Sequence, residues 1–336
     1  MSYSSPPRSA PRRSSPVSVR PSQLTGTVLG DRYKIHGYLR RGVGSRVFLA
    51  EDLESHGSVV IKMLSPAAAN DMERRMRLEQ ARAKLTPIQH GNLVDLLGVD
   101  ETDAGIPYLV MEALSGETLD ESLRRVGALP LDLALVVARQ AAAGLIALHD
   151  AGIVHGNVSP ENLMLLGAPT ELYGVKVLNY GIAAEFRDDQ SEQSFDPVRT
   201  AYRAPEQLLD ERADAESDVY ALGVVLLHSL CGKLPFQGAD EAECLRAKLE
   251  TNTLDKVWLD LGQDPRLETI IVNSTRKHPR NRYRSMRALL DALDVIVGLS
   301  ALDVRALPLT QSPDGYEPGT KRGRERLAAF MATRTP

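Results

Sequence analysis

Two kinds of periodicity divide the chain. From Asp31 onward, short runs carry β-branched or aromatic residues at every second position, which predicts strands over 32–42, 45–53, 58–64 and 107–112. Between Leu131 and Asp150 the period changes, and the apolar side chains form one helical stripe made of Leu135, Ala138, Ala142, Leu145 and Leu148. The pattern therefore predicts strands first and helices afterwards.

Both ends of the chain lack such periodicity. Residues 1–26 are rich in Ser, Pro and Arg and have no acidic side chain, so we expect a disordered basic tail, either a docking or phospho-acceptor arm or a passive extension. Residues 300–336 read as a second tail, whose last stretch is basic with Leu327, Phe330 and Met331 on one face. This segment could dock on a partner or an anionic surface, or pack back on the main domain.

Composition narrows the class of protein. With 336 residues and 43% hydrophobic residues, the chain can build one large domain, and a net charge of −4 gives no reason to expect nucleic-acid binding. Cys231 and Cys244 lack metal-ligand spacing and are typical of buried thiols in a cytosolic protein. No apolar run approaches the roughly 20 residues of a membrane span, so we expect no transmembrane segment.

Two motifs carry the candidate chemistry. Residues 153–165 read IVHGNVSPENLML, and residues 175–184 read VKVLNYGIAA. They resemble the catalytic loop H-R-D-L-K-P-E-N and the D-F-G motif of protein kinases. The resemblance implies an α+β, bilobal protein-kinase-like fold over 27–299, with a β-rich N-lobe at about 30–112 and a helical C-lobe at about 115–299.

The resemblance also implies a nucleotide site in which several positions have changed. Lys62 ends the run V-V-I-K, and its partner would be Glu79, or Glu73 as the alternative. Only Gly42 remains of the three phosphate-loop glycines, because Arg40 and Ser45 stand at the other two positions. The remaining positions assigned to nucleotide binding are Val47, Val60, Met111 and Met164.

The catalytic positions have lost their acids. Asn157 replaces the aspartate that accepts the substrate proton, Asn179 replaces the aspartate that holds Mg²⁺, Ser159 replaces the lysine of the loop, and Gly156 replaces the arginine. Asn162, the second metal position, is retained. With Gly156 in place of arginine, the segment 187–199 would also lack the usual receptor for an activating phosphate.

Residues that serve the architecture match the family. By resemblance, Glu206 pairs with Arg282, Asp218 holds the backbone of the catalytic loop, and His155 belongs to that loop. We therefore expect a pseudokinase, a cytoplasmic regulatory or scaffolding module that binds a protein partner such as an active kinase or its substrate. The alternatives are a weak or unconventional Ser/Thr kinase and an ATP sensor without turnover. No cofactor is required in this interpretation, and any ATP binding would be weak and largely independent of Mg²⁺.

Overall fold

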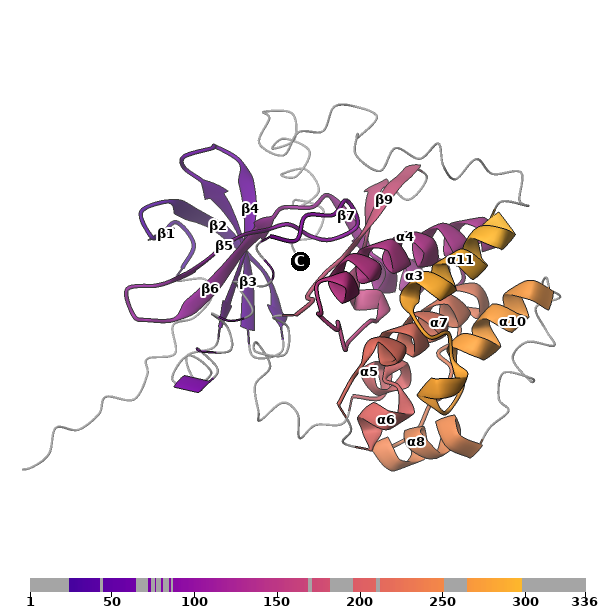
Figure 1. Cartoon of the computed structure of the whole chain (residues 1–336). Helices are drawn as coiled ribbons and strands as arrows, with labels where there is room; N and C mark the ends of the chain where they lie inside the picture. Colours follow the sequence, from indigo (N-terminus) through magenta and orange to yellow (C-terminus); the bar gives the residue numbers. More distant parts are fainter. Residues whose placement is uncertain are drawn as a thin grey trace, which may run out of the picture.

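The computed structural model describes residues 24–42, 45–64, 72–73, 76, 80, 85, 87–168, 171–181, 196–209, 212–250 and 265–297. A sheet-rich N-lobe is followed along the chain by a larger helical C-lobe, as the two kinds of periodicity predicted (Figure 1). The fold is therefore mixed α+β and bilobal.

The N-lobe is a six-stranded sheet in the order β1-β2-β3-β4-β6-β5. All of its strand pairs are antiparallel. The strands are β1 (Val28–Leu29), β2 (Tyr33–Gly42), β3 (Ser45–Asp52), β4 (Ser58–Leu64), β5 (Leu96–Glu101) and β6 (Pro107–Glu112).

The sheet buries side chains on both faces. One face holds its own core, in which Phe48, Ile61 and Tyr108 are fully buried. The other face, which carries Leu64 and Leu109, joins the large core cluster that continues into the C-lobe. Because β4 is buried on both sides, its sequence is a nearly continuous apolar run, and Lys62 is the one charged residue in it.

The N-lobe begins a few residues before the expected boundary at residue 27. Residues 24–26 were assigned to the N-terminal tail, but Leu24 packs against the N-lobe core and the Gly26 amide donates to the Ile35 carbonyl at 2.8 Å. Burial of the Leu24 side chain against the sheet stabilises this stretch, although the Ser/Pro-rich composition of the tail predicted disorder. The rest of that tail, the C-terminal segment 300–336 and Glu79 lie outside the described residues.

The C-lobe consists of helices and one small sheet, in the order β7-β8-β9. The strands are β7 (Gly116–Thr118), β8 (Leu163–Ala168) and β9 (Glu171–Val177). The helices are α3 (Leu119–Val126), α4 (Leu131–Asp150), α5 (Pro197–Tyr202), α6 (Pro205–Leu208), α7 (Ala215–Cys231), α8 (Glu241–Glu250), α10 (Pro265–Ser274) and α11 (Met286–Val297), with 3₁₀ turns η2 (Pro160–Asn162) and η3 (Pro279–Asn281).

Helix α4 packs against α7, α11 and β9 (Figure 1). By length and composition it could cross a membrane, but 67% of its apolar stretch is buried inside the fold. The stripe from Leu135 to Leu148 is buried throughout. Its apolar character is therefore explained by its place in the core.

Candidate functional site

Lys62 is positioned by the register of three strands. It lies opposite Val47 of β3 and Leu109 of β6, and its side chain is only 9% exposed. A lysine is rarely buried to this extent without a partner. Its Nζ donates to Oδ1 of Asn179 at 3.2 Å, which links the N-lobe sheet to the segment after β9.

A chain of amide hydrogen bonds continues from Lys62 into the catalytic loop. Nδ2 of Asn179 donates to Oδ1 of Asn162 at 2.8 Å. Nδ2 of Asn162 donates in turn to the Asn157 carbonyl at 2.8 Å and to Oγ of Ser159 at 3.2 Å. Four of the residues that sequence reasoning assigned to chemistry, together with Lys62, thus form one connected network, here called the amide chain.

The two ends of the amide chain fix the orientation of both side-chain amides. Lysine can only donate, so the atom of Asn179 that faces Lys62 must be the oxygen. A backbone carbonyl can only accept, so the atom of Asn162 that faces Asn157 must be the nitrogen. The Asn162 oxygen is consequently turned toward Asn179 and receives its NH₂ group.

This arrangement does not fit Mg²⁺. The ion prefers anionic oxygens in near-octahedral geometry and otherwise keeps its waters. Both side-chain amide oxygens of the amide chain are neutral and each already accepts a hydrogen bond, that of Asn179 from Lys62 and that of Asn162 from the Asn179 nitrogen. Within the described ranges, no group of three or more His, Cys, Asp or Glu side chains could hold a metal ion.

The backbone around Asn179 explains why an asparagine is accepted there. Asn179 has φ of 59°, in the left-handed region that Asn tolerates better than most residues. Gly181 also has φ of 59°, and a Cβ at this position would lie 3.0 Å from the Leu85 side chain. The turn is tied to the catalytic loop because the Leu178 amide donates to the Asn162 carbonyl at 2.8 Å.

Asp218 fixes the backbone of the catalytic loop by hydrogen bonds. Its buried carboxylate accepts the backbone amides of His155 and Gly156, each at 2.8 Å, and also accepts Nε2 of His149 at 2.8 Å. Gly156 has φ of 68°, so a glycine adopts this turn without the strain that a side chain would cause.

His155 connects the two motifs. Its Nε2 donates to the Leu178 carbonyl at 3.0 Å, and its Nδ1 accepts the Asn157 amide at 3.2 Å. The two partners fix the neutral tautomer, since one contact requires a donor and the other an acceptor. The residues named for architecture are thus hydrogen-bonded, and those at the proton-transfer positions, Asn157 and Ser159, carry no basic side chain.

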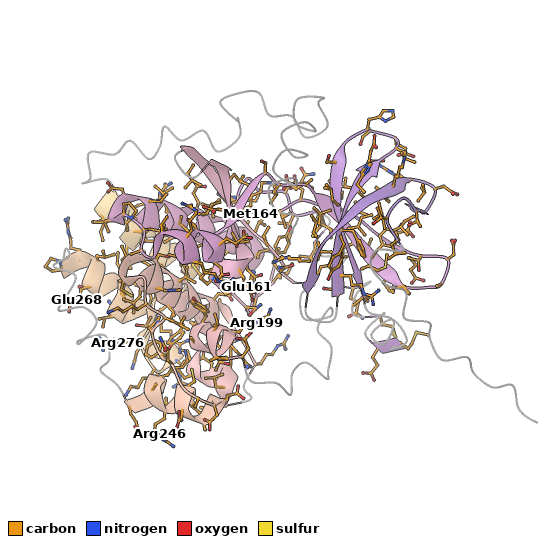
Figure 2. The ribbon with its side chains drawn as sticks, turned by 180° about the vertical axis from the view of Figure 1, so that it is seen from behind. Glu161, Met164, Arg199, Arg246, Glu268 and Arg276 are labelled. Atoms are coloured by element: carbon orange, nitrogen blue, oxygen red, sulfur yellow. The ribbon has the colours of Figure 1, made fainter. Side chains whose placement is uncertain are left out.

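Two of the positions assigned to nucleotide binding, Lys62 and Met111, line the same pocket, and the strand register places the others. Val60 pairs with Met111 across β4 and β6, Val47 is buried, and Gly42 pairs with Ser45 at the end of the β2–β3 ribbon. Met164 of β8 is half-buried and lies opposite Thr118; Figure 2 labels it on the C-lobe side. A pocket behind Met111 is lined by Lys62, Leu85, Val94, Leu96, Leu109, Met111, Asn179 and Tyr180.

The sequence interpretation overlooked two polar contacts behind this pocket. The Tyr180 hydroxyl donates to the Val94 carbonyl, and burial raises the pKa of this tyrosine. Lys176 pairs with Glu112, whose carboxylate also accepts the Asp95 amide at 2.8 Å. Burial raises the pKa of Glu112, and Lys176 opposes that shift. Each contact joins segments more than 60 residues apart, so local patterns gave no signal for it.

Helix α5 is attached beside the catalytic loop. Arg199 makes an ion pair with Glu161 of η2 at 2.9 Å, and both residues are labelled in Figure 2. The Tyr202 hydroxyl and Nδ1 of His228 are hydrogen-bonded at 2.6 Å, and Nζ of Lys248 donates to the Ala201 carbonyl at 2.6 Å. Residues 182–195 of the preceding segment lie outside the described part of the chain.

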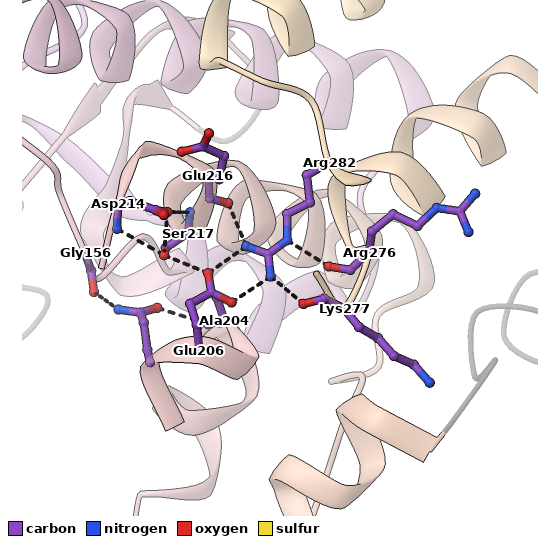
Figure 3. Close-up of polar contacts among 10 residues, drawn as sticks. Gly156, Ala204, Glu206, Asp214, Glu216, Ser217, Arg276, Lys277 and Arg282 are labelled. Carbon is purple, nitrogen blue, oxygen red and sulfur yellow. Dashed lines mark hydrogen bonds and ion pairs between the residues drawn. The ribbon is translucent and has the colours of Figure 1, made fainter. Parts of the chain in front are cut away.

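Arg282 and Glu206 form a buried bidentate pair (Figure 3). Both contacts are 2.7 Å, and the side chains are 0% and 5% exposed. The remaining N–H groups of Arg282 donate to the carbonyls of Glu216, Arg276 and Lys277, and Ser217 donates to Glu206. Burial pushes the pKa of Glu206 upward, but the Arg282 hydrogen bonds hold it below its usual value.

Comparison with known proteins gives the family. The sequence model of the protein kinase domain matches residues 33–293. Serine/threonine-protein kinase PknB of Mycobacterium leprae is 32% identical over 262 residues, which cover 76% of this chain and 42% of the relative. PknB of Mycobacterium tuberculosis is also 32% identical, over 78% of this chain and 42% of its own length. The chain thus spans less than half the length of these relatives.

Solved structures agree at the level of the fold. The kinase domain of Mycobacterium tuberculosis PknI aligns with a TM-score of 0.64 and 23% identity, covering 82% of this chain and 98% of that domain. A second structure of the PknI kinase domain gives a TM-score of 0.63. The relatives reported above are bacterial serine/threonine kinases. Because the family model matches most of the chain and the architecture is bilobal, the protein belongs to the protein kinase family.

Proposed function

We propose that this protein is a pseudokinase that acts as a regulatory or scaffolding module for a protein partner. The observation that carries the proposal is the amide chain from Lys62 through Asn179 and Asn162 to the Asn157 carbonyl. An amide cannot accept a proton at neutral pH, and losing a general base costs about 10²–10⁴ in rate. Loss of the metal carboxylate adds to this cost, although the two losses are not additive.

Preservation of the scaffold supports a binding role. Asp218, His155, Glu206 and Arg282 keep their hydrogen bonds. The catalytic acids are replaced by Asn157 and Asn179, but the buried ion pair and the fixed catalytic loop remain. These features keep a defined surface that a partner could recognise. We propose a protein partner, such as an active kinase or its substrate. We also place the protein in the cytoplasm, where its free thiols Cys231 and Cys244 would stay reduced.

Retention of Lys62 favours a second candidate, an ATP sensor without turnover. A buried ammonium within the apolar strand β4 still offers a cation to phosphate. The absence of a carboxylate from the amide chain would make such binding weak and independent of Mg²⁺. Both candidates share the loss of phosphotransfer.

A phosphotransfer assay tests the proposal. The purified protein is incubated with radiolabelled ATP, with Mg²⁺ or Mn²⁺, alone and with a generic basic protein substrate, beside a Lys62→Ala variant. A PknB kinase domain serves as positive control. We expect incorporation no higher than that of Lys62→Ala. Incorporation that depends on Lys62 would instead establish a weak kinase and reject the pseudokinase proposal.

A further inference from the structure

Strand β5 forms one edge of the N-lobe sheet. It pairs with β6 on one side, and the described part of the chain supplies no strand for its outer side. The register shifts between Leu96 and Gly98, which leaves Leu97 without a partner in β6 and with its side chain 55% exposed. The four positions from Gly98 to Glu101 then pair regularly with β6. The outer edge of such a strand presents backbone N–H and C=O groups with which a further strand can pair.

The regular part of this edge is acidic. Asp100, Glu101 and Asp103 stand at the end of β5 and in the turn to β6, and all three are exposed. Burial raises the pKa of the nearby Tyr108, and the charges of Asp100 and Asp103 add to this shift. A cationic segment would therefore suit this edge better than a neutral or acidic one, because opposite charges on paired strands attract.

Residues 17–20 of the N-terminal tail match this edge in length, pattern and charge. They read VSVR between Pro16 and Pro21, and residues 1–23 contain four arginines and no acidic residue. Valine at alternate positions favours a strand. Proline lacks the N–H that a strand pair uses, so the two prolines limit pairing to the four residues between them. The regular edge of β5 offers the same number of positions.

The tail is joined to the N-lobe close to this edge. Leu24 and Ile106, the residue before β6, both pack against the same N-lobe core. A Cβ at Gly30 would lie 3.4 Å from Oδ2 of Asp100, so the stretch that follows the tail passes beside the acidic end of β5. An extended chain covers about 3.3 Å per residue, so the four steps from Leu24 back to Arg20 span about 13 Å. This short link keeps the segment at a high local concentration near β5.

We propose that residues 17–20 add to the outer edge of β5 as a further strand, with the arginines of the tail beside the carboxylates at the end of β5. The occupant of this surface is the protein's own N-terminal tail. Such a strand closes the edge of the sheet and keeps the strands of other chains from pairing there. The inference concerns the N-lobe edge and does not depend on the loss of phosphotransfer.

Hydrogen exchange of the full chain, read by mass spectrometry, tests the proposal at residues 96–101. In a variant whose four tail arginines are replaced by serine, these amides should exchange about tenfold faster than in native protein, because the added strand is lost. About 1 M NaCl should remove most of this difference, since it screens the attraction. Asp103→Lys should exchange as fast as the tail variant. The control is Glu54→Lys, an equal change of charge at an exposed position of the same lobe, which should exchange like native protein.

Disulfide trapping locates the tail. A Cβ at Gly98 meets nothing within 4 Å, so Gly98→Cys fits the strand, and together with Val19→Cys it should form an intramolecular disulfide under mild oxidation. Leu53→Cys with Val19→Cys is the control, because the Leu53 amide bonds to the Arg32 carbonyl at 2.9 Å, near the start of the same lobe. This second pair should form little disulfide.

Three results would overturn the proposal. The first is equal exchange at residues 96–101 in native protein and the arginine-to-serine variant. The second is equal disulfide formation at Gly98→Cys and Leu53→Cys, which would show a tail without a preferred place. The third is protection of residues 96–101 that grows with protein concentration, which would assign the edge to a second copy of the chain.

Discussion

Lys248 shows how a single residue links two elements of the C-lobe. It is 3% exposed on α8, where its Nζ donates to the Ala201 carbonyl and lies 4.7 Å and 5.2 Å from the ring centres of Phe236 and Tyr220. Burial lowers its pKa from 10.5 to about 7. A carbonyl and two aromatic faces thus replace the water that normally surrounds an ammonium group.

This lysine should give the folding stability a definite pH dependence. Between pH 7 and 10.5 the unfolded chain holds a proton that the folded chain has released, so the free energy of unfolding rises with pH in that window. The contribution is at most about 1.4 kcal/mol per pH unit. Urea unfolding at pH 6.5, 8 and 9.5 should show this rise in native protein and a flatter profile in Lys248→Met. The exposed Lys233→Met is the control, and equal slopes for Lys248→Met and native protein would contradict the assignment.

At the scale of elements, α4 and β9 are held together by a buried amide cluster and a close backbone approach. Asn92 donates to Oε1 of Gln140 at 3.1 Å and to the Val175 carbonyl at 2.9 Å, and Gln140 accepts the Val175 amide at 2.7 Å. Gly144 of α4 lies so near this segment that an added Cβ would be 2.6 Å from the Asn92 carbonyl oxygen.

Gly144→Ala should therefore destabilise the protein, against the helix propensity of the new residue. In an open helix the change to alanine is worth about 1 kcal/mol in favour of folding. Here the overpacked Cβ should reverse the sign and lower the free energy of unfolding by about 1–3 kcal/mol. Gly37→Ala in β2 is the control for an added Cβ that meets no neighbour, because nothing lies within 4 Å of a Cβ there. Urea unfolding measures both, and a more stable Gly144→Ala protein would show that α4 can move away from Asn92.

The sequence predicted the elements better than their polar contacts. The apolar stripe from Leu135 to Leu148 predicted α4, and the alternation of side chains along the strands predicted β2, β3 and β4. Burial of one face leaves such a regular pattern in the sequence. The amide chain joins Lys62 to Asn179, 117 positions further on, and the orientation of each amide follows only from its neighbours. The motifs named its members, but no local pattern indicated that they would bond to one another. The attachment of Tyr180 to Val94 was unforeseen for the same reason.

At the scale of the whole molecule, the two lobes share one apolar cluster and the Lys62–Asn179 hydrogen bond. A ligand in the cleft would contact both lobes. The effect of Mg²⁺ on the affinity for such a ligand therefore depends on the residues where the lobes meet. In an ordinary kinase site Mg²⁺ bridges phosphate to a carboxylate and strengthens binding. Here Mg²⁺ would mask phosphate charge from Lys62 without a carboxylate in the amide chain to receive it.

We therefore expect Mg²⁺ to leave ATP affinity unchanged or to lower it. Calorimetry with ATP in EDTA and then in millimolar Mg²⁺ measures the effect. Asn179→Asp is the matched variant, since it restores one carboxylate in nearly the same volume, and its ATP affinity should rise with Mg²⁺. Tight ATP binding by native protein that requires the metal would instead show that Asn179 and Asn162 form a working metal site.

The charge of the amide chain has a consequence for the conditions under which the cleft can be occupied. The amide chain contains one cation, Lys62, and no anion, since its other members are amides, a hydroxyl and a carbonyl. Attraction between a single ammonium and a phosphate weakens as dissolved salt screens it, over about 10 Å at 0.1 M ionic strength. Occupancy of this cleft would thus follow total salt rather than the supply of a particular divalent ion, which makes ionic strength the variable to hold constant when ligands are compared.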